Sequence, residues 1–168
     1  KIASVIGRTF SYPVLYDVHP IPEDKEHLRT SLQILESLDI TPLEAPEPDL
    51  IYIFKHIITQ EVSYNLMSFA QRQQMHREVA AWYETHHAED LQPLYPLLAY
   101  HWSKASVTEK AVEYFEKAGQ EALRSGAYQE AVRFLQNAIQ WDAQIPPPEN
   151  EPAIPVSWTV HITPSQFR

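Results

Sequence analysis

Residues 111–145 read AVEYFEKAGQEALRSGAYQEAVRFLQNAIQWDAQI, and they carry the clearest structural signal in the chain. Small and aromatic side chains recur there at the spacing of two closely packed helices, with the small ones where the backbones approach. The residues concerned are Ala111, Phe115, Ala118, Gly119, Ala122, Gly126, Tyr128, Ala131, Phe134 and Ala138. The pattern predicts a pair of packed helices.

A repeat unit fits this pair. When Val112 takes position 1 of a 34-residue unit, the unit ends at Ile145. It then has Phe115 at position 4, Gly119 at 8, Ala131 at 20 and Ala138 at 27. The unit resembles a tetratricopeptide repeat, although Ala122 replaces the usual aromatic residue and Pro146 closes it three residues late. We expect a degenerate unit before it, at residues 94–104, and further repeats in a longer parent protein, because such units bury their faces against neighbours.

Proline marks the boundaries outside this unit. The chain has 14 Pro and only 3 Gly, and the prolines cluster at 13–22, 42–48, 93–96 and 146–164. The long stretches between the last three clusters are free to be helical. We therefore expect four parts: a winged-helix-like subdomain at 1–56, a helical linker at 57–92, repeat helices at 93–145, and an extended proline-rich tail at 146–168.

The first part predicts two helices followed by a β-hairpin. A short helix is expected over 11–17, and leucines at helical spacing predict one helix over 24–38. Residues 40–43 and 50–54 predict two strands, since the second is β-branched and aromatic and a proline-bearing loop joins them. This order is typical of a winged helix. The predicted fold class is therefore mainly α, with a small hairpin and repeat-like helices.

Charge and composition exclude several classes of partner. The 168 residues include 13 Lys+Arg and 22 Asp+Glu, a net charge of −9, which disfavours nucleic acid and anionic lipid. The chain has no cysteine, no apolar run of membrane-spanning length and no signal-peptide core at residues 1–10. We expect a cytoplasmic protein with no membrane partner. The chain starts without Met on the expected inside of a helix, which favours a segment of something longer.

A winged helix raises the alternative of a DNA-binding regulator. The helix that would read DNA, within 23–39, has two basic and five acidic residues. A helix that enters a groove of DNA needs the opposite charge. The charge therefore favours a winged helix that packs on protein.

No catalytic or metal site is predicted in this segment. The chain has no Gly-x-Ser-x-Gly elbow, no Walker A loop and no His-Glu-x-x-His run. His86 and His87 lie near Glu89 and Asp90, but adjacent residues on a helix diverge by about 100° and do not face one ion. We expect no catalysis and no cofactor bound by this segment alone.

The most distinctive stretch is residues 52–64, YIFKHIITQEVSY. It places Lys55 and His56 where the last strand meets the next helix. Free backbone N–H groups and the positive end of the helix dipole at such a position favour a phosphate. The alternative is a histidine that caps the helix or packs where two domains meet.

These residues resemble a known class. Residues 3–10 (ASVIGRTF), the leucine helix, Phe54–His56 with residues 60–64, and Arg72 with His76 are similar to the stretch after the ATPase core of STAND-class signalling ATPases. That class includes bacterial class III adenylate/guanylate cyclases and kinases with a tetratricopeptide-repeat tail. The resemblance implies a winged helix that closes over nucleotide, with a histidine on the ADP phosphate at the position of His56. The commonest form has Met before and Asp after that histidine, whereas Lys55 and Ile57 flank it here.

The resemblance implies a regulatory and protein-interaction segment of a larger ATPase, with a cyclase or kinase as the possible output domain. ATP or ADP would be held with an upstream ATPase module in cis, through His56 and Lys55, and the repeats would bind a protein or peptide. The alternative is a free-standing adaptor of tetratricopeptide type. Exposed apolar residues on the terminal helix would favour missing repeats, and a polar outer face would favour a finished adaptor. The stripe Ala131, Leu135, Ala138 and Trp141 does not decide between them, since it can pack inward.

Overall fold

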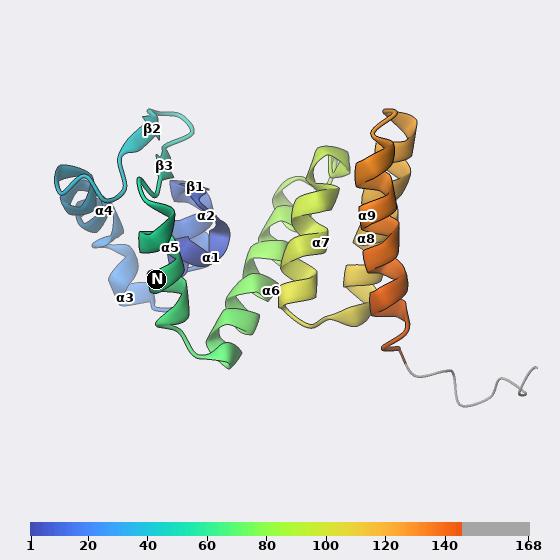
Figure 1. The fold of residues 1–168 in the computed structure, drawn as a ribbon. Coiled ribbons are helices and arrows are strands. Elements are labelled where there is room, and N and C mark those ends of the chain that lie inside the picture. Colours follow the sequence, from blue (N-terminus) through green and yellow to red (C-terminus); the bar gives the residue numbers. More distant parts are fainter. Residues whose placement is uncertain (146–168) are drawn as a thin grey trace, which may run out of the picture.

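The structure is a computed structural model that describes residues 1–145 of the chain. The tail predicted at 146–168 lies outside the described residues. The elements, in order, are α1 (Ile2–Ile6), β1 (Thr9–Ser11), α2 (Tyr12–Asp17), α3 (Pro22–Lys25), α4 (Leu28–Ser37), β2 (Leu43–Ala45), β3 (Ile51–Ile53), α5 (Ile57–Asn65), α6 (Phe69–His86), a 3₁₀ turn η1 (Gln92–Leu94), α7 (Tyr95–Lys104), α8 (Thr108–Arg124) and α9 (Tyr128–Asp142). Figure 1 shows the small sheet with α1–α5 on one side of the molecule and α8–α9 on the other.

The predicted fold class, mainly α with a small sheet, is confirmed. The prediction of two strands was incomplete, because the antiparallel sheet has three, in the order β1-β3-β2. The additional strand, β1, places Phe10 opposite Tyr52 of β3. Only the middle residue of this three-residue strand is buried. One apolar side chain cannot show the alternation of apolar and polar residues that predicts a strand. No helix within residues 1–145 has the length and apolar character that crossing a membrane requires.

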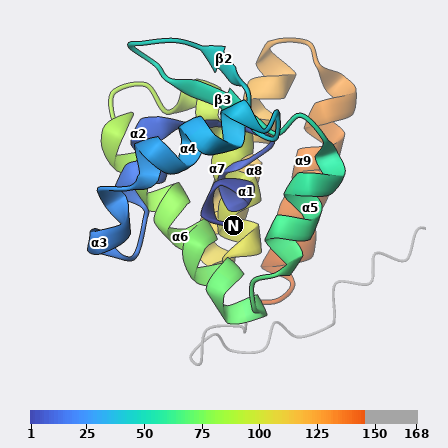
Figure 2. The ribbon, with the colours of Figure 1, turned by 90° about the vertical axis from the view of Figure 1, so that its left-hand side faces the viewer.

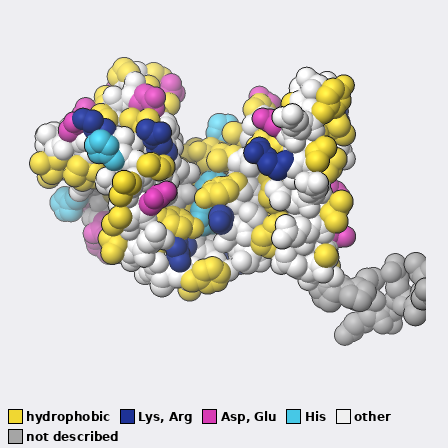
Figure 3. Space-filling view, viewed as in Figure 1, with side chains coloured by type: hydrophobic (Ala, Val, Ile, Leu, Met, Phe, Trp, Pro, Cys, Tyr) yellow, Lys and Arg dark blue, Asp and Glu magenta, His cyan; other side chains and the backbone are white. Residues whose placement is uncertain are grey.

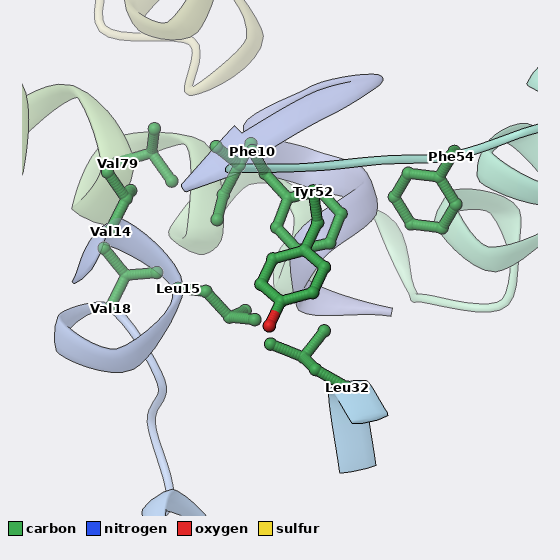
Figure 4. Packing of buried hydrophobic residues seen from close by; sticks show 9 residues of the cluster. Phe10, Val14, Leu15, Val18, Leu32, Tyr52, Phe54 and Val79 are labelled. Carbon is green, nitrogen blue, oxygen red and sulfur yellow. The ribbon is translucent and has the colours of Figure 1, made fainter. Parts of the chain in front are cut away.

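Aromatic packing holds the sheet to the surrounding helices (Figure 4). The Phe10 ring stacks on Tyr52 at 5.9 Å between centroids and lies 5.4 Å from the ring of Phe54. Leu32 of α4 and Val79 of α6 complete this first core. Burial of such side chains contributes roughly 1.5–3 kcal/mol each, so the sheet depends on its helices for stability.

The single helix predicted over 24–38 is wrong, since two helices, α3 and α4, occupy that stretch. Apart from Pro22, α3 has only charged residues, and none of its residues is buried. Leu32 is the one buried residue of α4. Because α3 has no buried side chain to pack it as a continuation of α4, the helical stretch is interrupted before α4. His27 is the N-cap of α4.

Helix α6 contributes to both of the larger cores. Ser68 caps it: its hydroxyl accepts from Gln71 N at 3.2 Å, and Gln71 Oε1 accepts from Ser68 N at 2.9 Å. Val79 is fully buried in the first core, and its neighbour Ala80 is fully buried in the second, with α7, α8 and α9. Figure 2 shows α1 between α5 and α6, which matches its contacts with both.

The C-terminal helices pack closely, as the small residues predicted. An added Cβ at Gly119 of α8 would meet the side chain of Leu135 of α9 at 2.8 Å, so the glycine lets this leucine pack closely against α8. One carboxylate joins three of the helices: Glu84 Oε1 accepts from Trp102 Nε1 at 3.2 Å, Lys110 Nζ at 3.0 Å and Tyr114 Oη at 2.5 Å. Burial and this carboxylate raise the pKa of Tyr114 far above its ordinary value.

Candidate functional site

The structure places Lys55 and His56 where β3 passes into α5. The backbone of this junction stays tied to the sheet, since Phe54 N donates to Arg8 O at 2.8 Å and Lys55 N donates to Ile40 O at 3.1 Å. His56 then leaves the sheet as the N-cap of α5, with extended backbone angles. These backbone hydrogen bonds fix where the two residues leave the sheet.

The His56 side chain is exposed to solvent. Its carbonyl accepts from Thr59 N at 3.0 Å and closes the first turn of α5. The imidazole makes no side-chain cap bond to the helix. It is therefore available for an outside ligand, and the alternative that this histidine caps the helix through its ring finds no support.

Lys55 has a partner that the sequence did not indicate. Its ammonium forms an ion pair with Asp39 Oδ2, and both side chains are about half exposed. Asp39 lies in a left-handed turn, at φ 58°, after α4. Exposed ion pairs of this kind contribute about 0–1 kcal/mol, so an incoming anion can replace Asp39 at little cost.

Arg8 also reaches this junction, and the sequence reasoning missed it. Arg8 precedes β1, and Thr9 lies opposite Ile53 in the sheet. Arg8 Nε donates to the Phe54 carbonyl at 3.5 Å. A prediction of β1 and of its pairing with β3 would have placed Arg8 here, but β1 was not predicted.

Arg8, Lys55 and His56 together form what we call the junction site. Two cationic side chains, one of them paired with Asp39, and an imidazole suit the binding of an anion such as a phosphate. The junction site therefore suits an anionic ligand.

An exposed apolar face runs along α5 from this site. Ile58, Val62 and Leu66 repeat every four residues and are 68%, 54% and 63% exposed. Figure 3 shows hydrophobic side chains gathered over α5. We call these three residues the α5 face. Large apolar side chains in such a row are typical of surfaces that another protein covers.

The chain is similar to the uncharacterized protein R02095 of Rhizobium meliloti strain 1021. The identity is 28% over 155 residues, which is 86% of this chain and 14% of the relative. The chain thus spans only 14% of the length of the curated relative it matches. No protein-family model matches the sequence, and no solved structure matches the chain.

The histidines outside the junction site do not form a metal site within the described residues. Within residues 1–145, no group of three or more His, Cys, Asp or Glu is placed to hold a metal ion. The ring of His86 stacks on Trp82 at 4.1 Å, and its Nδ1 lies 2.9 Å from the Trp82 carbonyl oxygen, so it packs on its own helix.

His76 of α6 and His101 of α7 are fully buried and lie with their Nδ1 atoms 2.9 Å apart. Tyr64 Oη lies 3.0 Å from His76 Nε2. Burial lowers the pKa of His76 to about 4 and that of His101 to about 3, so both rings are neutral near pH 7. This pair joins α5, α6 and α7 and presents no surface to a ligand.

Proposed function

We propose that this chain is a non-catalytic regulatory and protein-interaction segment of a larger, cytoplasmic, nucleotide-dependent signalling ATPase of the STAND class. Its winged-helix part packs on an upstream ATPase module, and its repeat helices bind a partner. A nucleotide cyclase or kinase is the expected output domain. The coverage of only 14% of the curated relative supports a place in a longer protein.

The observation that carries the proposal is the α5 face beside the junction site. Ile58 and Val62 are more than half exposed, and they follow His56 directly along α5. An ATPase module seated on this face would bring its nucleotide beside Arg8, Lys55 and His56. Burial of the α5 face would supply the apolar contact, and the junction site would supply the charge that a phosphate needs.

The proposed mechanism is conformational. ADP held between the ATPase module and the junction site keeps the protein closed. ATP, or a partner on the repeat helices, favours an open state, which requires that each ligand bind the two states with different affinity.

The outer face of α9 favours this proposal over a finished adaptor. Tyr128, Val132 and Ile139 are each more than half exposed, whereas Ala131 and Ala138 are buried against α8. The stripe named from the sequence therefore packs inward, and a second apolar stripe faces solvent. This is the arrangement expected of a repeat on which a further repeat packs.

The test is the affinity of the full-length protein for ADP, measured by isothermal titration calorimetry, with and without His56→Ala. We expect the Kd for ADP to rise about tenfold, because one hydrogen bond to a charged phosphate is lost. His27→Ala is the matched control, since His27 is also an exposed N-cap histidine of the same subdomain. An unchanged Kd in His56→Ala contradicts the role of the junction site.

A further inference from the structure

A groove of about 510 Å³ lies between α7 and α9. One face of each helix lines it, with Tyr100, Ser103 and Lys104 on α7 and Arg133, Asn137 and Trp141 on α9. These residues recur at intervals of three to four, so each set lies on one side of its helix. Phe115 of α8 also lines the groove and forms its buried base. We call this feature the α7–α9 groove.

The charge of the α7–α9 groove is opposite to that of the chain. The chain has a net charge of −9, yet two cations and no carboxylate line the groove. Within residues 1–145, neither Lys104 nor Arg133 forms an ion pair, whereas Lys110 and Lys117 of α8 each pair with a glutamate. In Figure 3 the dark blue side chains of this half lie over α6, α7 and α9 on one face.

Aromatic rings hold these cations in place. Lys104 Nζ lies 5.8 Å from the centre of the Tyr100 ring, and Arg133 Cζ lies 5.2 Å from that of Phe134. Cation–π contacts at exposed sites are weak, about 0.5–1 kcal/mol, so they orient a cation without neutralising it. The charges stay available for a carboxylate. The exposed Tyr100 ring and the half-buried Trp141 ring offer flat apolar surface beside them.

The groove has two unlike ends. A smaller hollow of about 170 Å³ continues from it, sharing Pro96 and Phe134, and is lined by Glu121 and Glu130. The Lys104 end is basic, whereas the hollow at the other end carries two glutamates. Such polarity fixes the direction in which an extended ligand lies.

We infer that the α7–α9 groove binds an extended acidic segment of a partner protein. Its carboxylates pair with Lys104 and Arg133, and an apolar or aromatic side chain between them packs on Tyr100 and Trp141. The Asn137 amide lies among them and suits the backbone of the segment. This inference rests on the proposed function in one respect, since it specifies the chemistry of the partner of the repeat helices.

The test uses the full 168-residue chain and a phage library of random 12-residue peptides as the probe. We expect the selected peptides to be enriched in Asp and Glu over the starting library. The tightest peptide, labelled with fluorescein, is then titrated by fluorescence anisotropy. Lys104→Glu and Arg133→Glu should each weaken its binding by roughly tenfold. Arg77→Glu is the control, because Arg77 is an exposed cation of α6 that does not line the groove.

Three results overturn the inference. They are the absence of any selected peptide, selected peptides with no excess of acidic residues, and charge reversals that change the Kd no more than Arg77→Glu does. A dimer of the chain that Arg133→Glu dissociates, seen by analytical ultracentrifugation, also overturns it and assigns the groove to a second copy. A negative result in the peptide experiment does not change the ADP affinity expected for His56→Ala. The groove inference and the proposed function are therefore tested separately.

Discussion

At the scale of single residues, the histidine pair is the most unusual feature of the interior. His76 and His101 are polar, fully buried and in contact with each other. Burial disfavours a positive charge on either ring. Lys104 and Arg72 further disfavour a positive charge on His76, and His76 disfavours one on His101. The pair is stable only while both rings are neutral.

This pair predicts a loss of stability in mild acid. In the unfolded chain both histidines titrate near pH 6.5, whereas in the folded chain their pKa values are about 4 and about 3. Stability is therefore complete above pH 6.5 and falls as the unfolded state binds protons that the native state does not. Between pH 7 and pH 5 we expect the free energy of unfolding to drop by about 2 kcal/mol for each histidine, measured by urea denaturation.

Two variants test this assignment through the pH dependence of their free energy of unfolding. His101→Asn should remove about half of the pH dependence, whatever it does to stability at pH 7. His27→Ala, which changes an exposed histidine, should leave the dependence intact. A free energy of unfolding that stays flat between pH 7 and pH 5 contradicts the neutral pair.

At the scale of elements, the contact between α8 and α9 depends on one glycine. A methyl group at Gly119 would lie 2.8 Å from Cγ and Cδ2 of Leu135. Gly119→Ala gains up to about 1 kcal/mol of helix propensity, but overpacking costs about 1–3 kcal/mol. We expect a net loss of about 1 kcal/mol in the free energy of unfolding, measured by chemical denaturation.

A double-mutant cycle separates crowding from backbone effects. Leu135→Ala removes the atoms that the new methyl group would meet, so Gly119→Ala should cost less in that background, by at least about 0.5 kcal/mol. Gly126→Ala is the comparison, because Gly126 has φ 79° and no atom within 4 Å of an added Cβ. Its cost comes from the left-handed backbone alone and should not change with Leu135→Ala. Additive costs for Gly119 and Leu135 refute the close approach.

The same elements show what a sequence can and cannot indicate. The helix pair of residues 111–145 was predictable because its small residues recur over more than four turns. Strand β1 was not, because three residues with one buried side chain give no period. The split between α3 and α4 depends on the absence of a burial partner, which is a tertiary property.

The junction site was half predictable. The change from a β-branched run to a helical pattern placed Lys55 and His56 at a strand end, where the structure has them. Arg8 joins them only through the pairing of β1 with β3. Asp39 meets Lys55 only because a left-handed turn follows α4. Both depend on contacts between distant segments, which no local pattern encodes.

At the scale of the whole molecule, two apolar faces lie exposed, the α5 face and the outer face of α9 (Figure 3). A protein in a cell exposes such rows at the cost of aggregation unless something covers them. We therefore expect the native polypeptide to be much larger than 19.5 kDa. An immunoblot of source-cell extract, with an antibody against residues 50–140, should show a band several-fold heavier. A band near 19.5 kDa would remove the ATPase module and favour the free-standing adaptor.

The sharing of α6 between the two larger cores has a mechanical consequence. Val79 and Ala80 are consecutive, so their side chains point about 100° apart around one rigid rod, each locked in a different core. A twist of that rod about its own axis would turn both side chains by the same angle. The packing of the two cores is therefore linked through α6. A rotation of this 18-residue helix would therefore change the packing at both ends of the described chain.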